Sequence, residues 1–335
     1  MEKINTKNNV KLFAYAGIIF VVLVWGLVPP TVSYIYDFYS GAVYSAATSL
    51  IAAVSLLLLS VKKLDLLTND MLKIAIPTGI FNGLADLVQK IGLQYTTPTK
   101  YAFLENLSCV VVPILLFILI RKRPGVLTII ASIVCLAGSF VLTGMNFSDG
   151  AASFGIGEIL CALAGCFYGV NIAITGTYAK KFYAPLYVMV QIWVRFVISS
   201  ATAVVLNFIN INGQPIEQFK FSFDIWNLLV LLALGLVSNT LCWTIRTNAM
   251  KHISPNAVAI IMPFAAVVTG VASVALGMDE LTPNLLIGAG LGLAAALMCS
   301  FDDILEGKKA NKNKSSDSDV SDSTNAVEEA TEKIS

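Results

Sequence analysis

Long apolar stretches alternate with short polar segments from residue 12 to residue 301. Each stretch is about as long as a helix that crosses a hydrocarbon core ~30 Å thick. The longest connecting segment, residues 210–225, is too small to form a domain of its own. Ten stretches can be drawn, at residues 12–35, 41–61, 73–94, 99–120, 125–145, 155–178, 185–209, 226–249, 255–277 and 282–301. This pattern predicts an all-α integral membrane protein with ten transmembrane helices.

Composition supports a membrane protein and excludes several other classes. Of the 335 residues, 56% are hydrophobic and only 13% are charged, and the mean hydropathy is +0.77. A soluble domain carries about 25% charged residues. The net charge of +1 and the scattered basic residues argue against a nucleic-acid partner. All six cysteines fall in apolar stretches without zinc-ligand spacing, so we predict no metal site.

The distribution of lysine and arginine predicts the orientation in the membrane, because basic loop residues are retained on the cytoplasmic side. With a cytoplasmic N-terminus, fourteen basic residues up to position 309 fall on the inside and only Lys100 and Lys220 on the outside. The fourteen are Lys3, Lys7, Lys11, Lys62, Lys63, Lys73, Arg121, Lys122, Arg123, Lys180, Lys181, Lys251, Lys308 and Lys309. We therefore expect a multi-pass protein of the cytoplasmic (plasma) membrane with both termini inside.

The two ends of the chain are polar. Residues 1–11 are predicted to be a cytoplasmic N-terminus. Residues 306–335 are rich in serine, aspartate and glutamate and cannot bury enough apolar surface to offset the entropy of ordering. We expect a disordered cytoplasmic tail there.

An internal sequence similarity divides the apolar part of the chain into two units. The junction Gly92–Pro98 is similar to Ala249–Pro255 at an offset of 157 residues, and the two prolines coincide. An offset of 143 superposes Trp25-Gly26 on Tyr168-Gly169. We predict two five-helix units, residues 12–145 and 155–301. Because five is odd, the second unit is inverted in the membrane, which is an architecture that places a solute site near mid-bilayer between the halves.

At this point the chain resembles the EamA family of the drug/metabolite transporter superfamily, over Leu12 to Phe301. The resemblance rests on Trp25-Gly26, on the two junctions above, and on Gly277–Thr282 leading into Gly288–Gly292. It implies a ten-helix secondary carrier for small organic solutes, without a bound cofactor and directed outward. The scaffold does not name the solute.

Ionisable residues in the third and fourth stretches are the first candidates for the solute pathway, because an unpaired charge at bilayer depth costs roughly 2.5–3.5 kcal/mol. Asn82 and Asp86 share one helical stripe, and Tyr101 and Glu105 share another. Asp86 and Lys90 have the spacing of an intrahelical ion pair, so Asp86 is either structural or a site of binding or proton coupling. Glu105 has no opposite charge on its own face. It is either a proton or cation site or the partner of Lys90 or of an arginine on another helix.

The seventh stretch adds a third polar stripe, formed by Gln191, Arg195 and Ser199. Arg195 either grips a solute carboxylate or forms a structural tie to Asp86 or Glu105.

Aromatic and amide groups recur at helical spacing in the sixth and eighth stretches. Tyr168 and Asn171 share one stripe, Asn239 and Trp243 share another, and Trp25 lies deep in the first stretch. Such groups suit a planar or amino-containing solute, and they also suit ordinary helix packing. The predicted pathway residues are Trp25, Asn82, Asp86, Tyr101, Glu105, Tyr168, Asn171, Gln191, Arg195 and Trp243, with Glu105 and Asp86 as coupling candidates.

Two charged residues are predicted to reach water instead. Glu158 is a few residues inside the sixth stretch, and Arg246 is near the cytoplasmic end of the eighth. Long side chains at helix ends extend towards the interface.

The sequence predicts a secondary transporter of a small organic metabolite. Its expected partners are the solute and the lipid bilayer, and the protein is either a monomer or a homodimer. A membrane-embedded sensor or scaffold is the alternative. An enzyme ranks lower, because neither an HExxH sequence nor a paired His/Asp set is present.

Overall fold

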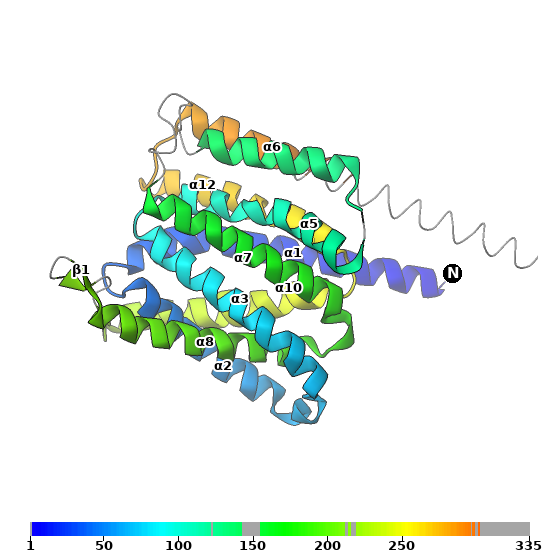
Figure 1. Cartoon of the computed structure of the whole chain (residues 1–335), viewed down its shortest axis with the longest axis horizontal. Coiled ribbons are helices and arrows are strands. Elements are labelled where there is room, and N and C mark those ends of the chain that lie inside the picture. Colours follow the sequence, from blue (N-terminus) through cyan, green and yellow to red (C-terminus); the bar gives the residue numbers. More distant parts are fainter. Residues whose placement is uncertain are drawn as a thin grey trace, which may run out of the picture.

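The chain runs back and forth as a bundle of roughly parallel and antiparallel helices (Figure 1). A computed structural model describes residues 2–121, 123–142, 155–211, 214–215, 219–295, 297–298 and 301. The expected polar tail, residues 306–335, lies outside the described residues. The first part of the chain forms α1 (Glu2–Ile35), α2 (Gly41–Ser60), η1 (Val61–Leu66), α3 (Asn69–Leu93), α4 (Pro98–Leu104), η2 (Glu105–Leu107), α5 (Ser108–Ile120) and α6 (Val126–Leu142).

The second part repeats this alternation of helices and short turns. It forms α7 (Ile156–Tyr178), η4 (Ala179–Lys181), α8 (Ala184–Phe208), α9 (Ile225–Ala233), η5 (Leu234–Cys242), α10 (Trp243–Ala249), α11 (Pro255–Ile261), α12 (Phe264–Ala275) and an unlabelled helix Pro283–Ala295. Two two-residue strands, β1 (Asn210–Ile211) and β2 (Gln214–Pro215), pair antiparallel between α8 and α9.

Within the described residues, seven helical segments are long and apolar enough to cross a membrane. They are Asn9–Ile35, Gly41–Leu66, Asn69–Leu93, Pro98–Ile120, Ile156–Tyr178, Ala184–Phe208 and Ile225–Ala249. The other three predicted stretches contain shorter apolar helices, Val126–Gly138, Phe264–Ala275 and Pro283–Ala295. The structure thus supports a multi-pass helical membrane protein, whereas ten spans stay a prediction.

The exterior of the bundle is apolar and much of its interior is polar. Phe13, Phe208 and Trp226 are each more than 70% exposed. Asp86 and Arg195, in contrast, are 3% and 1% exposed. Large exposed apolar side chains of this kind have no favourable partner in water, so they indicate a lipid-facing surface.

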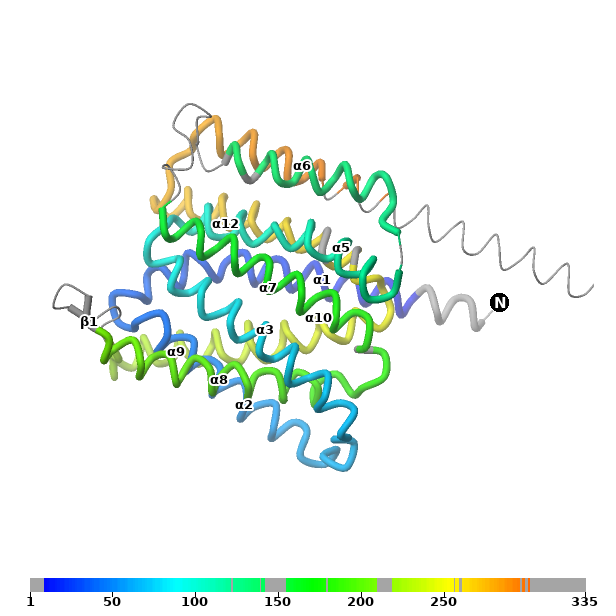
Figure 2. The backbone as a smooth tube through the Cα atoms, viewed as in Figure 1, coloured from blue at the N-terminus to red at the C-terminus, as the bar shows by residue number. Residues whose placement is uncertain are grey.

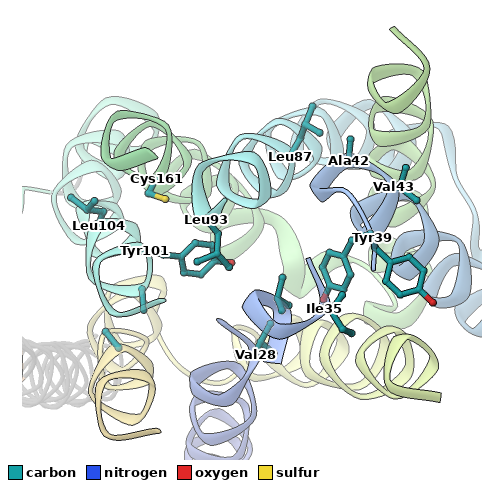
Figure 3. Close-up of a cluster of buried hydrophobic side chains, with 14 of the residues drawn as sticks. Val28, Ile35, Tyr39, Ala42, Val43, Leu87, Leu93, Tyr101, Leu104 and Cys161 are labelled. Atoms are coloured by element: carbon teal, nitrogen blue, oxygen red, sulfur yellow. The ribbon is translucent and has the colours of Figure 1, made fainter. Parts of the chain in front are cut away.

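Four apolar clusters hold the helices together. The largest joins α1, α2, α3, α4 and α7 and includes Ile35, Leu93 and Tyr101 (Figure 3). In that view Leu93 and Tyr101 lie next to each other, where α3 meets α4. This contact holds the start of α4 beside the end of α3, and it places polar side chains of both helices on one side.

The two junctions that echo each other in sequence have the same local structure. Thr97 caps α4 by accepting a hydrogen bond from the Lys100 amide, and Pro98 is at the first helical position. Ser254 caps α11 in the same way, and Pro255 follows it. Proline is favoured there because the first amide of a helix has no helical acceptor. Each helix then breaks after seven residues, α4 at Leu104 and α11 at Ile261, which again differ by 157 positions.

The chain also packs in matching pairs. Gly26 of α1 lies against Val268 of α12, and a Cβ on this glycine would be 2.5 Å from the Val268 Cβ. Gly169 of α7 lies against Val111 of α5, where the corresponding distance is 2.6 Å. The two glycines differ by 143 positions and the two valines by 157, the offsets found in the sequence.

Three segments that contain predicted cytoplasmic basic residues lie at one end of the bundle. The segments that join α2 to α3, α5 to α6 and α7 to α8 lie at the same end as the N-terminus (Figure 2). The α1–α2 turn and strand β1 lie at the opposite end (Figure 1).

Candidate functional site

A cavity opens among the helices of both parts of the chain. It contains about 770 Å³ of space between atoms, part of it open to solvent. Five ionisable side chains line it, together with four large aromatic ones. The ionisable residues are Asp86, Lys90, Glu105, Arg195 and Arg246, and the aromatic residues are Trp25, Tyr101, Tyr168 and Trp243.

Three aromatic rings form one wall of the cavity. The Trp243 ring centroid is 5.3 Å from that of Trp25 and 6.2 Å from that of Tyr168, with tilted planes. The Trp25 indole N–H donates to the Ser238 carbonyl at 3.2 Å. That carbonyl belongs to η5, a π-helical segment, in which the normal ladder of i→i−4 hydrogen bonds is interrupted. The hydrogen bond fixes the ring of Trp25 at the cavity surface.

Asp86 and Arg195 form an ion pair between α3 and α8. The Arg195 Nη2 lies 3.3 Å from the Asp86 Oδ1, and the Arg195 Nε donates to the Ser49 hydroxyl at 2.8 Å. The Ser45 hydroxyl donates to the other Asp86 oxygen and lies 2.8 Å from the Ser199 hydroxyl. Of the two ties expected for Arg195, to Asp86 or to Glu105, the one to Asp86 forms. The i, i+4 pair predicted between Asp86 and Lys90 is not the pairing of this carboxylate.

Lys90 uses neutral partners. Its ammonium donates to the Tyr101 hydroxyl at 2.7 Å and lies 5.7 Å above the Tyr44 ring. The backbone carbonyl of Lys90 accepts from the Tyr36 hydroxyl at 2.7 Å. These contacts hold a cation at the cavity surface without an acidic partner.

Glu105 lies at the break between α4 and α5. Its Oε2 accepts from the Gln89 amide at 2.8 Å. Among the described residues, no lysine or arginine is within ion-pair distance of this carboxylate. Because a helix break frees backbone groups and turns side chains off the regular stripe, the break at Glu105–Leu107 lets Glu105 reach the cavity.

Arg246 corrects the sequence interpretation. It was expected to extend to water at the end of its helix, yet it is only 2% exposed and lines the cavity. Its guanidinium lies 4.4 Å above the Trp243 ring and 5.7 Å from the Trp25 ring, and Nη2 donates to the Asn171 Oδ1 at 3.0 Å. Helices α1 and α8 pack against α10, which places this side chain inside the bundle instead of at its end.

Glu158 is the second correction. It is 8% exposed and its Oε1 binds the Lys100 ammonium at 3.4 Å and the Thr96 hydroxyl at 2.9 Å. Beside it, the Thr99 hydroxyl and amide both donate to Asp279. These contacts tie the start of α4 to α7 and to the segment after α12. They form a polar clamp at one end of the bundle.

Three of the predicted pathway residues are buried but are not among the described residues that line this cavity. Asn171 accepts a hydrogen bond from Arg246 without lining the cavity itself, and its amide also donates to the Thr78 carbonyl at 3.0 Å. The Gln191 amide donates to the Thr78 hydroxyl at 2.8 Å. Both amide atoms of Asn82 lack a hydrogen-bond partner among the described residues. The other seven predicted pathway residues all line the cavity.

Polar residues that line the cavity but were not among the predicted pathway residues include Gln89, Lys90, Asn239 and Arg246. The offset of 157 contains a signal for two of them, because it relates Gln89 to Arg246 as it relates Asp86 to Trp243. A residue at the position equivalent to a cavity residue is itself a cavity candidate. Trp25 and Tyr168, 143 positions apart, obey the same rule, and so do Glu105 and Met262 at 157.

Metal chemistry finds no support in the described ranges, which contain no group of three or more His, Cys, Asp and Glu side chains placed to hold a metal ion.

Comparison with known proteins gives a consistent result. The chain matches the EamA-like transporter family over residues 12–144 and 155–301. It is 25% identical over 297 residues to an uncharacterized transporter of Archaeoglobus fulgidus, covering 87% of each protein. It also resembles a protein of known crystal structure with a TM-score of 0.63 at 15% identity, covering 88% of this chain and 98% of the other, and that likeness concerns the fold alone. The chain is therefore a multi-pass membrane transporter that belongs to the EamA-like transporter family of the drug/metabolite transporter superfamily.

Proposed function

We propose that the protein is a secondary carrier that moves a small organic metabolite by alternating access between two inverted five-helix repeats, ten transmembrane helices in all. The observation that supports this most is that both halves contribute matching positions to the cavity wall. Trp25 and Tyr168, Asp86 and Trp243, and Gln89 and Arg246 are equivalent positions of the two halves, and all six line one cavity. A site on the symmetry axis of two inverted units can open to either side as they rock.

The packing of the helices supports the inverted arrangement. Helix α1 runs from the end with the N-terminus, whereas α7 begins at the opposite end (Figure 1). Helix α1 packs on α12, and its proposed equivalent α7 packs on α5. Helix α3 packs on α7 and α8, while η5 and α10 pack on α1 and α2 in the equivalent way.

The polar clamp lies at the end of the bundle opposite the basic turns. This supports a conformation in which the cavity is closed at the end with the clamp. In the proposed orientation this is the external side, with both termini in the cytoplasm. The proposed membrane is the cytoplasmic (plasma) membrane, and export is the proposed direction, on the family resemblance alone. The proposed transport involves no chemical change of the solute.

Of the two coupling candidates, we assign the proton to Glu105. Asp86 pairs with Arg195 and accepts a hydrogen bond from Ser45, so protonation of Asp86 would leave a buried guanidinium without its partner. Glu105 has only a neutral amide, which can also hydrogen-bond a protonated carboxyl. Glu105 can therefore gain or lose a proton without breaking an ion pair.

The first experiment identifies a solute and then tests coupling. A thermal-shift screen of the purified protein against amines, organic acids, nucleosides and sugars selects ligands that stabilise the fold. Reconstituted protein is then assayed for pH-driven uptake and for solute exchange. In Glu105→Gln we expect pH-driven uptake to fall to the level of empty liposomes, while exchange stays within about twofold, because the amide keeps the bond to Gln89 but cannot carry a proton.

Equal loss of uptake and exchange in Glu105→Gln would instead assign Glu105 to binding or folding. Lys181→Gln, on the exposed turn after α7, serves as the matched control and should change neither activity.

A further inference from the structure

The charges around the cavity do not balance in pairs. Three basic and two acidic side chains line it, and among the described residues only Asp86 and Arg195 pair with each other. Lys90 is held by Tyr101, Glu105 by Gln89 and Arg246 by Asn171, which are all neutral partners. Two cations and one carboxylate are thus left to face a solute.

Of these charged residues, Arg246 most needs a further hydrogen-bond acceptor. One of its five N–H donors reaches Asn171, and its Nε has no hydrogen-bond partner among the described residues. The side chain is 98% buried, since its exposed fraction is 2%. A buried charged donor without a partner costs more than a typical hydrogen bond gains. Its position on the cavity surface means that a ligand can supply the missing acceptor.

The rings beside Arg246 restrict how that acceptor approaches. Because the guanidinium lies above the Trp243 ring at 4.4 Å, this ring covers one of its faces. The N–H groups at the edge of a guanidinium form a fork that matches the two oxygens of a carboxylate. Trp25, Trp243 and Tyr168 continue from this point as an apolar wall suited to a flat group.

We infer that the transported solute is a small organic carboxylate with a flat apolar body, bound with its carboxylate on Arg246 and its body against Trp25, Trp243 and Tyr168. This inference rests on the proposed carrier function of the same cavity. Glu105 lines the cavity too, so a monoanion fits better than a dianion such as a phosphate ester.

Three probes with the same body and different head groups test the inference: 3-phenylpropionate, 3-phenylpropanamide and 3-phenylpropylamine. Dissociation constants come from titrated thermal shifts of the full-length purified protein. We expect the acid to bind and the amide and amine to bind at least about tenfold more weakly, as expected for the loss of one charge-assisted interaction.

Variants of Arg246 locate the head group. Arg246→Gln should weaken binding of the acid by about 10- to 100-fold and leave the amide unchanged, whereas Arg246→Lys keeps the charge, loses the fork and should fall between. The melting temperature of each variant without ligand shows that it is folded. Lys181→Gln, which removes an exposed cation, should bind as the parent does.

The inference is overturned if the acid produces no shift, if acid and amide bind equally, or if folded Arg246→Gln binds the acid as the parent does. The carrier proposal fails differently. In that case no solute exchanges across reconstituted membranes, and a cysteine introduced in the cavity reacts with impermeant reagents from one side only.

Discussion

At the scale of residues, Asp86 and Glu105 show how two similar carboxylates differ in their hydrogen-bond and charge partners. Both lie in apolar stretches and both line the cavity. Asp86 receives a guanidinium and a hydroxyl, while Glu105 receives one amide. A buried ion pair contributes little net stability, but removing one partner leaves an uncompensated charge. These different surroundings make Asp86 a structural tie, and in the proposed carrier they leave Glu105 free to exchange a proton.

Asp86→Asn and Arg195→Gln should each lower the free energy of unfolding by about 3–5 kcal/mol, because each leaves a buried charge alone. The double variant Asp86→Asn with Arg195→Gln should lose clearly less than the sum. Chemical unfolding in detergent, arranged as a double-mutant cycle, measures the coupling. Additive losses would show that the two side chains, 3.3 Å apart, do not stabilise each other.

At the scale of elements, close helix contacts depend on glycines that the sequence places at equivalent positions. Gly26 and Gly169 each bring a helix so near its neighbour that a Cβ would be less than 3.0 Å from a valine Cβ. Gly290, in the helix Pro283–Ala295, has nothing within 4 Å of such a Cβ. The contrast separates glycines needed for packing from a glycine that is merely present.

Gly26→Ala and Gly169→Ala should each cost about 1–3 kcal/mol of stability, because the added methyl group forces the helices apart. Gly290→Ala should be neutral or gain up to about 1 kcal/mol, since alanine favours the helix. Midpoints of thermal unfolding in one detergent compare the three. Similar effects at Gly26 and Gly290 would contradict the tight α1–α12 contact.

At the scale of the whole molecule, the bundle has one basic end and a lipid-facing surface. The basic turns lie at the end with the N-terminus, and the α1–α2 turn lies at the other (Figure 2). Because basic segments stay on the cytoplasmic side, this end is expected to face the cytoplasm. The polar clamp of Lys100, Glu158, Thr99 and Asp279 then faces outward.

A pair of exposed lysines tests this orientation. In a background with the six native cysteines replaced by alanine, Lys220→Cys should react with an impermeant maleimide on intact cells. Lys62→Cys should react only after the membrane is permeabilised. Lys62 is exposed in η1, between α2 and α3, and Lys220 is exposed shortly before α9. The α2–α3 segment and the start of α9 lie at opposite ends of the bundle (Figure 2). The reverse labelling pattern would invert the proposed topology.

Several features followed from the sequence alone, for local physical reasons. Apolar length predicted membrane helices, and the similarity of Gly92–Pro98 to Ala249–Pro255 predicted two equivalent junctions. In the structure both junctions contain a capped helix start, because capping depends on adjacent residues. Helical spacing also put Asp86 on a polar stripe. The offsets of 143 and 157 residues recur in contacts such as that of Gly26 with Val268.

Tertiary structure decided which charges meet. Spacing along one helix favoured Lys90 as the partner of Asp86, but α8 brings Arg195 to it across the bundle. Distance from a helix end suggested that Arg246 reaches water, yet α1 and α8 pack against α10 and bury the side chain, whose guanidinium lies over the Trp243 ring. Periodicity fixes the face of a single helix, whereas ion pairs and burial depend on how each helix is rotated against its neighbours, and only the packed fold determines that rotation.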